Sequence, residues 1–182
     1  MVEYGLPILY ALLVWWFATG AILYVVGLSS RTYRWSMLAA TAILVASLVG
    51  LSICATDTTI AGAYLSFTFG ILIWGWHEMG FLTGLVTGPR KIASPPGCRG
   101  WRHFGYAIQT ILYHECAVIL TAVVVVLLTW GGANQVGMWT FMVLWWMRLS
   151  AKLNIFLGAP NIPEGFLAPH LEYLKTYFRR RS

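Results

Sequence analysis

Five long apolar runs constrain the fold of this chain more than any other feature of its sequence. A helix that crosses the hydrocarbon core of a bilayer needs about 20 mostly apolar residues, so each run is long enough for one crossing. We therefore predict an all-α fold, a polytopic transmembrane helical bundle of about five spans within residues 1–158. The spans are expected at 6–28, 37–55, 59–87, 104–130 and 136–157.

The composition excludes a soluble globular domain. Of the 182 residues, 59% are hydrophobic and only 10% are charged, far from the balance of soluble proteins. The first run has no basic residue before it and no small-residue cleavage site after it, so we interpret it as a span rather than a signal peptide. Cys54, Cys98 and Cys116 show no CxxC spacing and two of them lie in apolar runs, which argues against a disulfide framework or a zinc knuckle.

The basic residues predict the orientation of the bundle. Apart from Arg148 and Lys152 inside the fifth run, Lys and Arg follow the first and third runs and end the chain. The other side, with Glu3, Asp57 and "GGANQ", has none. By the positive-inside rule the N-terminus lies outside and the C-terminus in the cytoplasm. The net charge of +6 then indicates topology and attraction to anionic lipid headgroups, rather than nucleic-acid binding.

Two segments are expected on the cytoplasmic side. Pro89 is predicted to end the third helix, and the loop 88–103 that follows is a candidate contact surface. The tail 159–182 is predicted to lie in the membrane interface, because Leu171, Leu174 and Phe178 recur at helical spacing. Arg179–Arg181 would hold it to anionic lipid. The candidate contact residues of the loop are Arg90, Lys91, Arg99, Arg102 and His103.

Two His-Glu dyads interrupt the apolar runs. One lies in "ILIWGWHEMGFLTG" (71–84) and the other in "ILYHECAVIL" (111–120). His77 lies thirteen residues before Arg90, and His114 lies twelve residues after Arg102, so the two dyads are expected at the same depth on neighbouring antiparallel helices. That shared depth predicts one polar layer inside the bundle.

The fifth run supplies matching positive charges at that depth. Arg148 and Lys152 are spaced i and i+4 and therefore share one helix face. Charges inside a bilayer are costly and almost always face the bundle interior and pair, so we expect Glu78 and Glu115 to balance them. Polar residues at nearby depths, expected to join the layer, are Gln109 and Asn154.

The residues leave several roles open for this layer. It could be a paired structural core with hydrogen-bonded histidines. It could also be a metal site, although the two adjacent residues of each dyad point about 100° apart around the helix and cannot both face one metal ion easily. A third role is axial ligation of a (bacterio)chlorophyll or haem by His77 or His114, and a proton relay is the weakest. Gly80, Gly84 and Gly88 at spacing four predict a ridge for helix packing or for docking a client helix.

Three long stretches resemble a known membrane protein family. They are "WHEMGFLTGLVTGPRK", "GWRHFGYAIQTILYHE" and "MWTFMVLWWMRLSAKLNIFLGAPNIPEGFLAPHLEYLKTYF", and they resemble the photosynthetic complex assembly protein 2 family (PuhE type) of anoxygenic phototrophic bacteria. The resemblance covers residues 7–178. Members continue past the last stretch into further membrane segments, so it implies that this chain is C-terminally shortened. The positions that match are His77, Glu78, Arg90, Lys91, Arg102, His103, His114, Glu115, Arg148, Lys152 and Asn154.

The resemblance implies an inner-membrane protein, encoded with photosynthesis genes, that helps to assemble the reaction centre and its core antenna. We accordingly expect an assembly factor without enzymatic turnover, which holds or hands over (bacterio)chlorophyll or docks client helices. Its expected partners are membrane lipids and reaction-centre or antenna subunits or other assembly factors. The alternative is a membrane metalloenzyme with a His/Glu metal site between the third and fourth spans.

Overall fold

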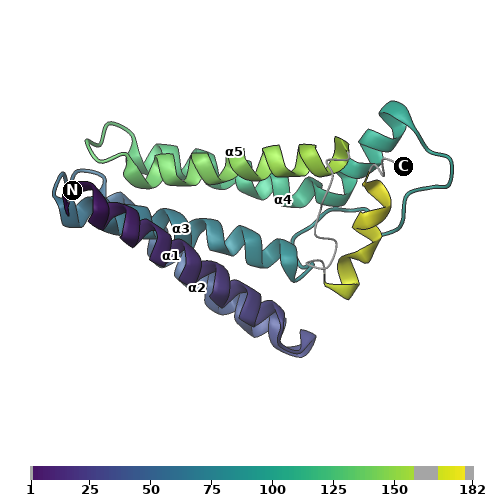
Figure 1. The fold of residues 1–182 in the computed structure, drawn as a ribbon, viewed down its shortest axis with the longest axis horizontal. Helices are drawn as coiled ribbons and strands as arrows, with labels where there is room; N and C mark the ends of the chain where they lie inside the picture. The colour runs from purple at the N-terminus through teal and green to yellow at the C-terminus, as the bar shows by residue number, and fades with distance from the viewer. Residues whose placement is uncertain (1, 158–167, 179–182) are drawn as a thin grey trace.

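The computed structural model describes residues 2–157 and 168–178 of the chain (Figure 1). Within these ranges the structure is helical and contains no strand. Short 3₁₀ helices lie at η1 (Ser30–Thr32) and η3 (Pro169–Tyr177). The five long helices are α1 (Val2–Val26), α2 (Tyr33–Cys54), α3 (Ile60–Leu82), α4 (Gly100–Thr129) and α5 (Val136–Leu157).

All five long helices run between the same two ends of the molecule (Figure 1). We call one the basic end, where the α1–α2 turn, the loop between α3 and α4, and η3 lie. The other is the Asn134 end, with the α2–α3 and α4–α5 turns. Within residues 2–157 and 168–178, three segments are long and apolar enough to cross a membrane: Gly5–Val26, Ser30–Cys54 and Gly100–Thr129. α3 and α5 are 23 and 22 residues long but are not among these three segments.

Small residues let α3 occupy the centre of the bundle. Gly62, Ser66 and Gly70 recur at spacing four and are all buried in α3. A Cβ atom on Gly70 would lie only 2.9 Å from the carbonyl oxygen of Gly137 in α5. The close approach of α3 and α5 therefore depends on glycine, as in the small-xxx-small contacts of membrane helices.

The prediction that Gly80, Gly84 and Gly88 form one ridge on a helix is wrong, because α3 ends at Leu82 rather than near Thr87. Gly84 adopts a left-handed conformation with φ of 73°, which is the usual way for a glycine to end a helix. Pro89 is thus not the residue that stops α3. Of the three glycines only Gly80 lies in the helix, where it is buried. The other helix bounds agree with the predicted runs to within about one turn.

The Asn134 end is held by a polar clasp between its two turns. The side-chain amide of Asn134 donates to the carbonyl oxygen of Asp57 (2.9 Å) and to the hydroxyl of Ser66 (3.0 Å). Its backbone amide donates to the carbonyl oxygen of Ala55 at 2.9 Å. Asn134 is only 6% exposed. Hydrogen bonds from the side chain and the backbone amide of Thr59 lower the pKa of Asp57.

The tail segment packs onto the bundle as a 3₁₀ helix. Because such a helix has about three residues per turn, Leu171, Leu174 and Tyr177 form one buried face. The predicted α-helical face with Phe178 as its third member is therefore replaced by one ending at Tyr177. Leu171 and Leu174 contact Phe81 near the end of α3. The predicted boundary at 158/159 and the contacts of Arg179–Arg181 lie outside the described residues.

Candidate functional site

Four charged side chains pair inside the basic half of the bundle. Arg148 Nε lies 3.3 Å from Glu78 Oε1, which joins α5 to α3. Lys152 Nζ donates to Glu115 Oε1, which joins α5 to α4. The i, i+4 spacing on α5 directs both cations to the same side. The structure thus brings together the two glutamates and two cations that the sequence placed at one depth.

An aromatic ring connects these charges to the histidines. Phe81 lies one helical turn after His77, and its ring centroid is 5.4 Å from Arg148 Cζ and 5.4 Å from Lys152 Nζ. These distances are within the range of cation–π attraction. Phe81 also contacts His114 edge to face, with 5.0 Å between ring centroids. One aromatic side chain therefore lies close to both cations and to His114.

His77 and His114 meet in the centre of the bundle. Their ring centroids are 6.1 Å apart with planes at 88°, and the residues are 1% and 0% exposed. His114 continues a buried face of α4 that includes Thr110 and Val118 at spacing four. Within the described part of the chain, none of the four imidazole nitrogens has a hydrogen-bond partner.

Two predicted members of the layer do not join it. Gln109 and Asn154 are both exposed. Gln109 precedes His114 by five residues, which turns it about 140° around α4, and Asn154 follows Lys152 by two, which turns it about 160° away on α5. These residues were predicted to join the layer from their depth alone, and their angular position about the helix axis places them outside the layer.

The segment after α3 inserts its backbone against α4. The amide of His114 donates to the carbonyl oxygen of Thr87 at 2.8 Å, and the amide of Arg90 donates to that of Gln109 at 3.3 Å. A Cβ atom on Gly88 would collide with the backbone of Gln109 and Thr110. Gly88 therefore permits a close approach between a loop and a helix, rather than between two helices.

The basic loop is divided between an inner network and an exposed rim. Arg90 Nε donates to the hydroxyl of Tyr177 at 2.7 Å. The ring nitrogens of His103 lie 3.1 Å from Ser94 Oγ and 3.1 Å from the carbonyl oxygen of Tyr177. These contacts fasten η3 to the loop and to α4. The exposed rim consists of Lys91, Arg99 and Arg102.

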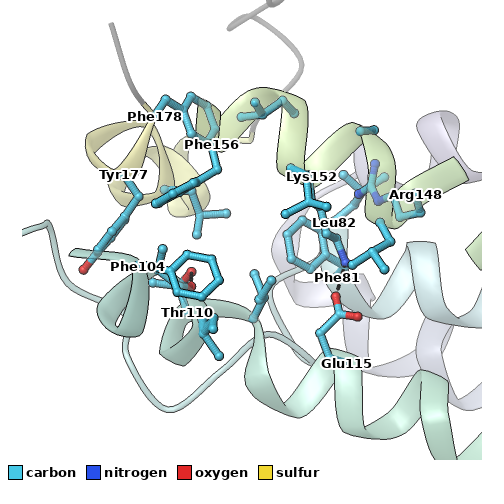
Figure 2. A pocket seen from close by; sticks show the side chains of 18 residues that line it. Phe81, Leu82, Phe104, Thr110, Glu115, Arg148, Lys152, Phe156, Tyr177 and Phe178 are labelled. Carbon is cyan, nitrogen blue, oxygen red and sulfur yellow. Dashed lines mark hydrogen bonds and ion pairs between the residues drawn. The ribbon is translucent and has the colours of Figure 1, made fainter. Parts of the chain in front are cut away.

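A cavity of about 530 Å³ lies between α4, α5 and η3. Figure 2 shows aromatic side chains at one end of it and the Lys152–Glu115 pair at the other. The polar end includes Arg148, while Leu174 of η3 contributes to the wall. A volume of this size is typical of sites for small molecules and cofactors. The aromatic residues at the end opposite Lys152 are Phe104, Phe156, Tyr177 and Phe178, and Phe81 lies beside Lys152.

Axial ligation of a (bacterio)chlorophyll by His77 or His114 does not fit this arrangement. The unpartnered nitrogens would suit a ligand, but a macrocycle needs open space beside the ring. Both imidazoles are enclosed by aromatic side chains such as Trp76 and Phe81, and neither lines the cavity. The structure therefore places the space for a ligand beside Lys152 and not beside the histidines.

The His/Glu metal site considered from the sequence is not assembled either. Among residues 2–157 and 168–178, no group of three or more His, Cys, Asp and Glu side chains is placed to hold one metal ion. The reason is that Glu78 and Glu115 turn to Arg148 and Lys152, while the histidines face each other.

Comparison with known proteins gives two matches in sequence. The model of a family described as "Protein of unknown function (DUF3623)" matches residues 1–182. A Rhodobacter capsulatus protein named "Uncharacterized 30.4 kDa protein in puhA 5'region" is 37% identical over 170 residues. The alignment covers 91% of this chain and 62% of the relative, so the chain spans less than two thirds of the relative's length. No solved structure matches.

Proposed function

The chain belongs to the DUF3623 family, and from that premise we propose that it is an inner-membrane assembly factor for the bacterial photosynthetic reaction centre and its core antenna. It acts without catalytic turnover, by holding an apolar molecule of those complexes in the cavity between α4, α5 and η3. The observation that carries this proposal is the cavity itself, with its aromatic walls and its half-buried ion pair.

Two lines of support point to photosynthesis. The R. capsulatus relative is named for its position in the puhA 5′ region, among photosynthesis genes. The three long stretches of the sequence resemble a family of photosynthetic complex assembly proteins. The chain's molecular partners in this proposal are reaction-centre and antenna subunits or other assembly factors, together with the lipids around it.

The proposed setting is a bacterial cytoplasmic or intracytoplasmic membrane crossed five times. All five long helices run between the two ends of the molecule (Figure 1), and the loop and turns that carry Arg31, Arg90 and Lys91 lie at one of them. That asymmetry supports a cytoplasmic basic end. A reporter fused after Asn134 is expected to be periplasmic, and a cytoplasmic signal there would contradict the five-span topology.

Filling the cavity tests the proposed function in cells. Ala107 on α4 and Ala151 on α5 both line the cavity, so Ala107→Trp and Ala151→Trp would each occupy it from a different helix. In a phototrophic strain that lacks its own copy, the wild-type gene should restore the absorption bands of the reaction centre and core antenna. Each filled variant should restore them to less than about half at equal protein level.

A matched variant separates loss of the cavity from the general effect of a new tryptophan. Ala46 is exposed on α2, away from the cavity, so Ala46→Trp should restore the complexes fully. If the filled variants restore them as well as the wild type does, the cavity has no part in assembly.

A further inference from the structure

We propose that the cavity binds a neutral, flat ring molecule through a ring carbonyl oxygen that accepts a hydrogen bond from Lys152, with an apolar tail along the remaining wall. This inference rests on the proposed function in one respect, because both take this cavity as the binding site. It names the chemistry of the ligand, which the family and its relative leave open.

The polar end of the cavity has more hydrogen-bond donors than the protein uses. An ammonium carries three N–H donors and a guanidinium five. Lys152 makes one hydrogen bond, to Glu115, among the described residues. Arg148 has its ion pair with Glu78, but its Nε has no partner in hydrogen-bond geometry there. An acceptor oxygen on a ligand would use donors that face this end.

Counting the described residues alone, the same end offers no net charge to balance a charged ligand. The two glutamates and the two cations cancel, and the pairs are largely enclosed, with side-chain exposures of 16% for Lys152 and 20% for Glu115. An anion such as a fatty-acid carboxylate would meet Glu115 in a medium that screens charge poorly. A carbonyl oxygen accepts hydrogen bonds without bringing a charge, so it suits this site better than a carboxylate.

The walls favour a flat ring with an apolar tail. Phe104, Phe156 and Tyr177 come from α4, α5 and η3 and surround the end opposite Lys152 (Figure 2). Aromatic side chains pack well against the faces of planar rings. The aliphatic residues Ile108 and Leu153 line the cavity and are also exposed on the bundle surface, which gives a tail a path to the lipid.

Two kinds of membrane molecule share this chemistry. A quinone carries ring carbonyls and an isoprenoid tail, and a (bacterio)chlorophyll carries a ring ketone and a long esterified tail. No histidine is among the described residues that line the cavity, so a pigment bound here would be recognised by its carbonyl and not by its central magnesium. The prediction is therefore that removing the magnesium leaves binding unchanged.

A titration of the purified full chain in lipid nanodiscs tests this inference. The probes are a decyl-tailed quinone, bacteriochlorophyll a, its magnesium-free form, and oleate. Binding is measured by quenching of intrinsic tryptophan fluorescence and checked by retention on gel filtration. We expect the quinone or both pigment forms to bind at least tenfold more tightly than oleate, and the two pigment forms to agree within threefold.

Variants locate the binding in the cavity. Ala107→Trp removes space, and the double variant Lys152→Met with Glu115→Leu removes the donor while leaving no unpaired charge, a change that buried ion pairs often tolerate. Both should weaken binding at least tenfold. Lys175→Met is the control, because Lys175 is a cation of η3 that pairs with Glu172 and does not line the cavity. It should bind like the wild type.

Several results would overturn the inference while leaving the proposed function to its own test in cells. These are no binding of any ring probe, binding of the magnesium form alone, oleate as tight as the rings, or unchanged binding in the double variant.

Discussion

Asn134 at one end of the bundle and the polar layer in the basic half differ in how many of their hydrogen-bonding groups are used. At the Asn134 end, the side-chain amide of Asn134 donates to Asp57 and Ser66, and its oxygen accepts from the amide of Val136. In the basic half, Lys152 and Arg148 use few of their donors, and the nitrogens of His77 and His114 use none among the described residues.

The difference separates a structural role from a binding role. A fully satisfied polar group fixes the geometry of the chain around it, and nothing about it calls for another molecule. Unused hydrogen-bond donors beside a cavity of ligand size lower the stability of the folded protein unless a bound molecule accepts hydrogen bonds from them. The Asn134 end therefore explains how the bundle closes, and the basic half is where function is to be sought.

The largest predicted effect comes from breaking one ion pair. Lys152→Met alone leaves Glu115 without its partner in a largely enclosed place, and the expected loss is about 3–5 kcal/mol of unfolding free energy. Denaturant titration in a mild detergent measures it. Adding Glu115→Leu should recover most of the loss, and a double variant as unstable as the single one would show that the pair itself stabilises the bundle.

A smaller loss is expected from Gly88→Ala. The new methyl group would meet the backbone of Gln109 and Thr110, and neither can move without disturbing α4, so the expected cost is about 3 kcal/mol. Gly105→Ala is the control, because a Cβ atom there has no neighbour within 4 Å in the described part of the chain. Equal melting temperatures for the two variants would mean that the loop does not approach α4 so closely.

Breaking the polar clasp should cost about 1–3 kcal/mol. Asn134→Ala leaves the carbonyl of Asp57 and the hydroxyl of Ser66 without their donor. Because the clasp is structural, thermal unfolding should shift while ligand binding at the other end, measured on the folded variant, stays the same. A change in ligand binding without a change in stability would contradict the structural role assigned to the Asn134 end.

The smallest effect on stability is expected at the histidines. Replacing an unsatisfied buried polar group by an apolar one of similar size is close to neutral or stabilising, so His77→Leu should change the unfolding free energy by less than about 1 kcal/mol. Thermal unfolding of the purified variant measures this. A loss of more than about 2 kcal/mol would mean that the imidazole has a partner in the folded protein.

The sequence was sufficient to predict the helices and the pairing of charges, because both depend on local regularities. Apolar length predicts a span, and charges spaced i and i+4 must share a side. It could not predict where α3 ends, since a glycine that adopts a left-handed turn, such as Gly84, looks the same in sequence as one inside a helix.

The cavity could not be predicted from the sequence either, for a different reason. Phe104, Phe156 and Tyr177 lie far apart along the chain, and only the packing of three segments brings them together. The candidate functional residues that the sequence did not reveal are therefore these aromatic residues of the cavity wall. Their only sequence signal is aromatic residues near the basic ends of two runs and in the tail, which is also typical of an ordinary interfacial belt.

The most direct test of the account is to identify what the cavity holds in the cell. Wild-type protein, Ala107→Trp and Ala46→Trp are purified in parallel from a phototrophic host, and the molecules extracted from each are identified and quantified by mass spectrometry. We predict that a neutral, carbonyl-bearing ring molecule accompanies the wild type and Ala46→Trp in near-stoichiometric amount and is at least tenfold depleted from Ala107→Trp. The same extracted molecules in equal amounts from all three proteins would contradict the claim that this cavity is a binding site.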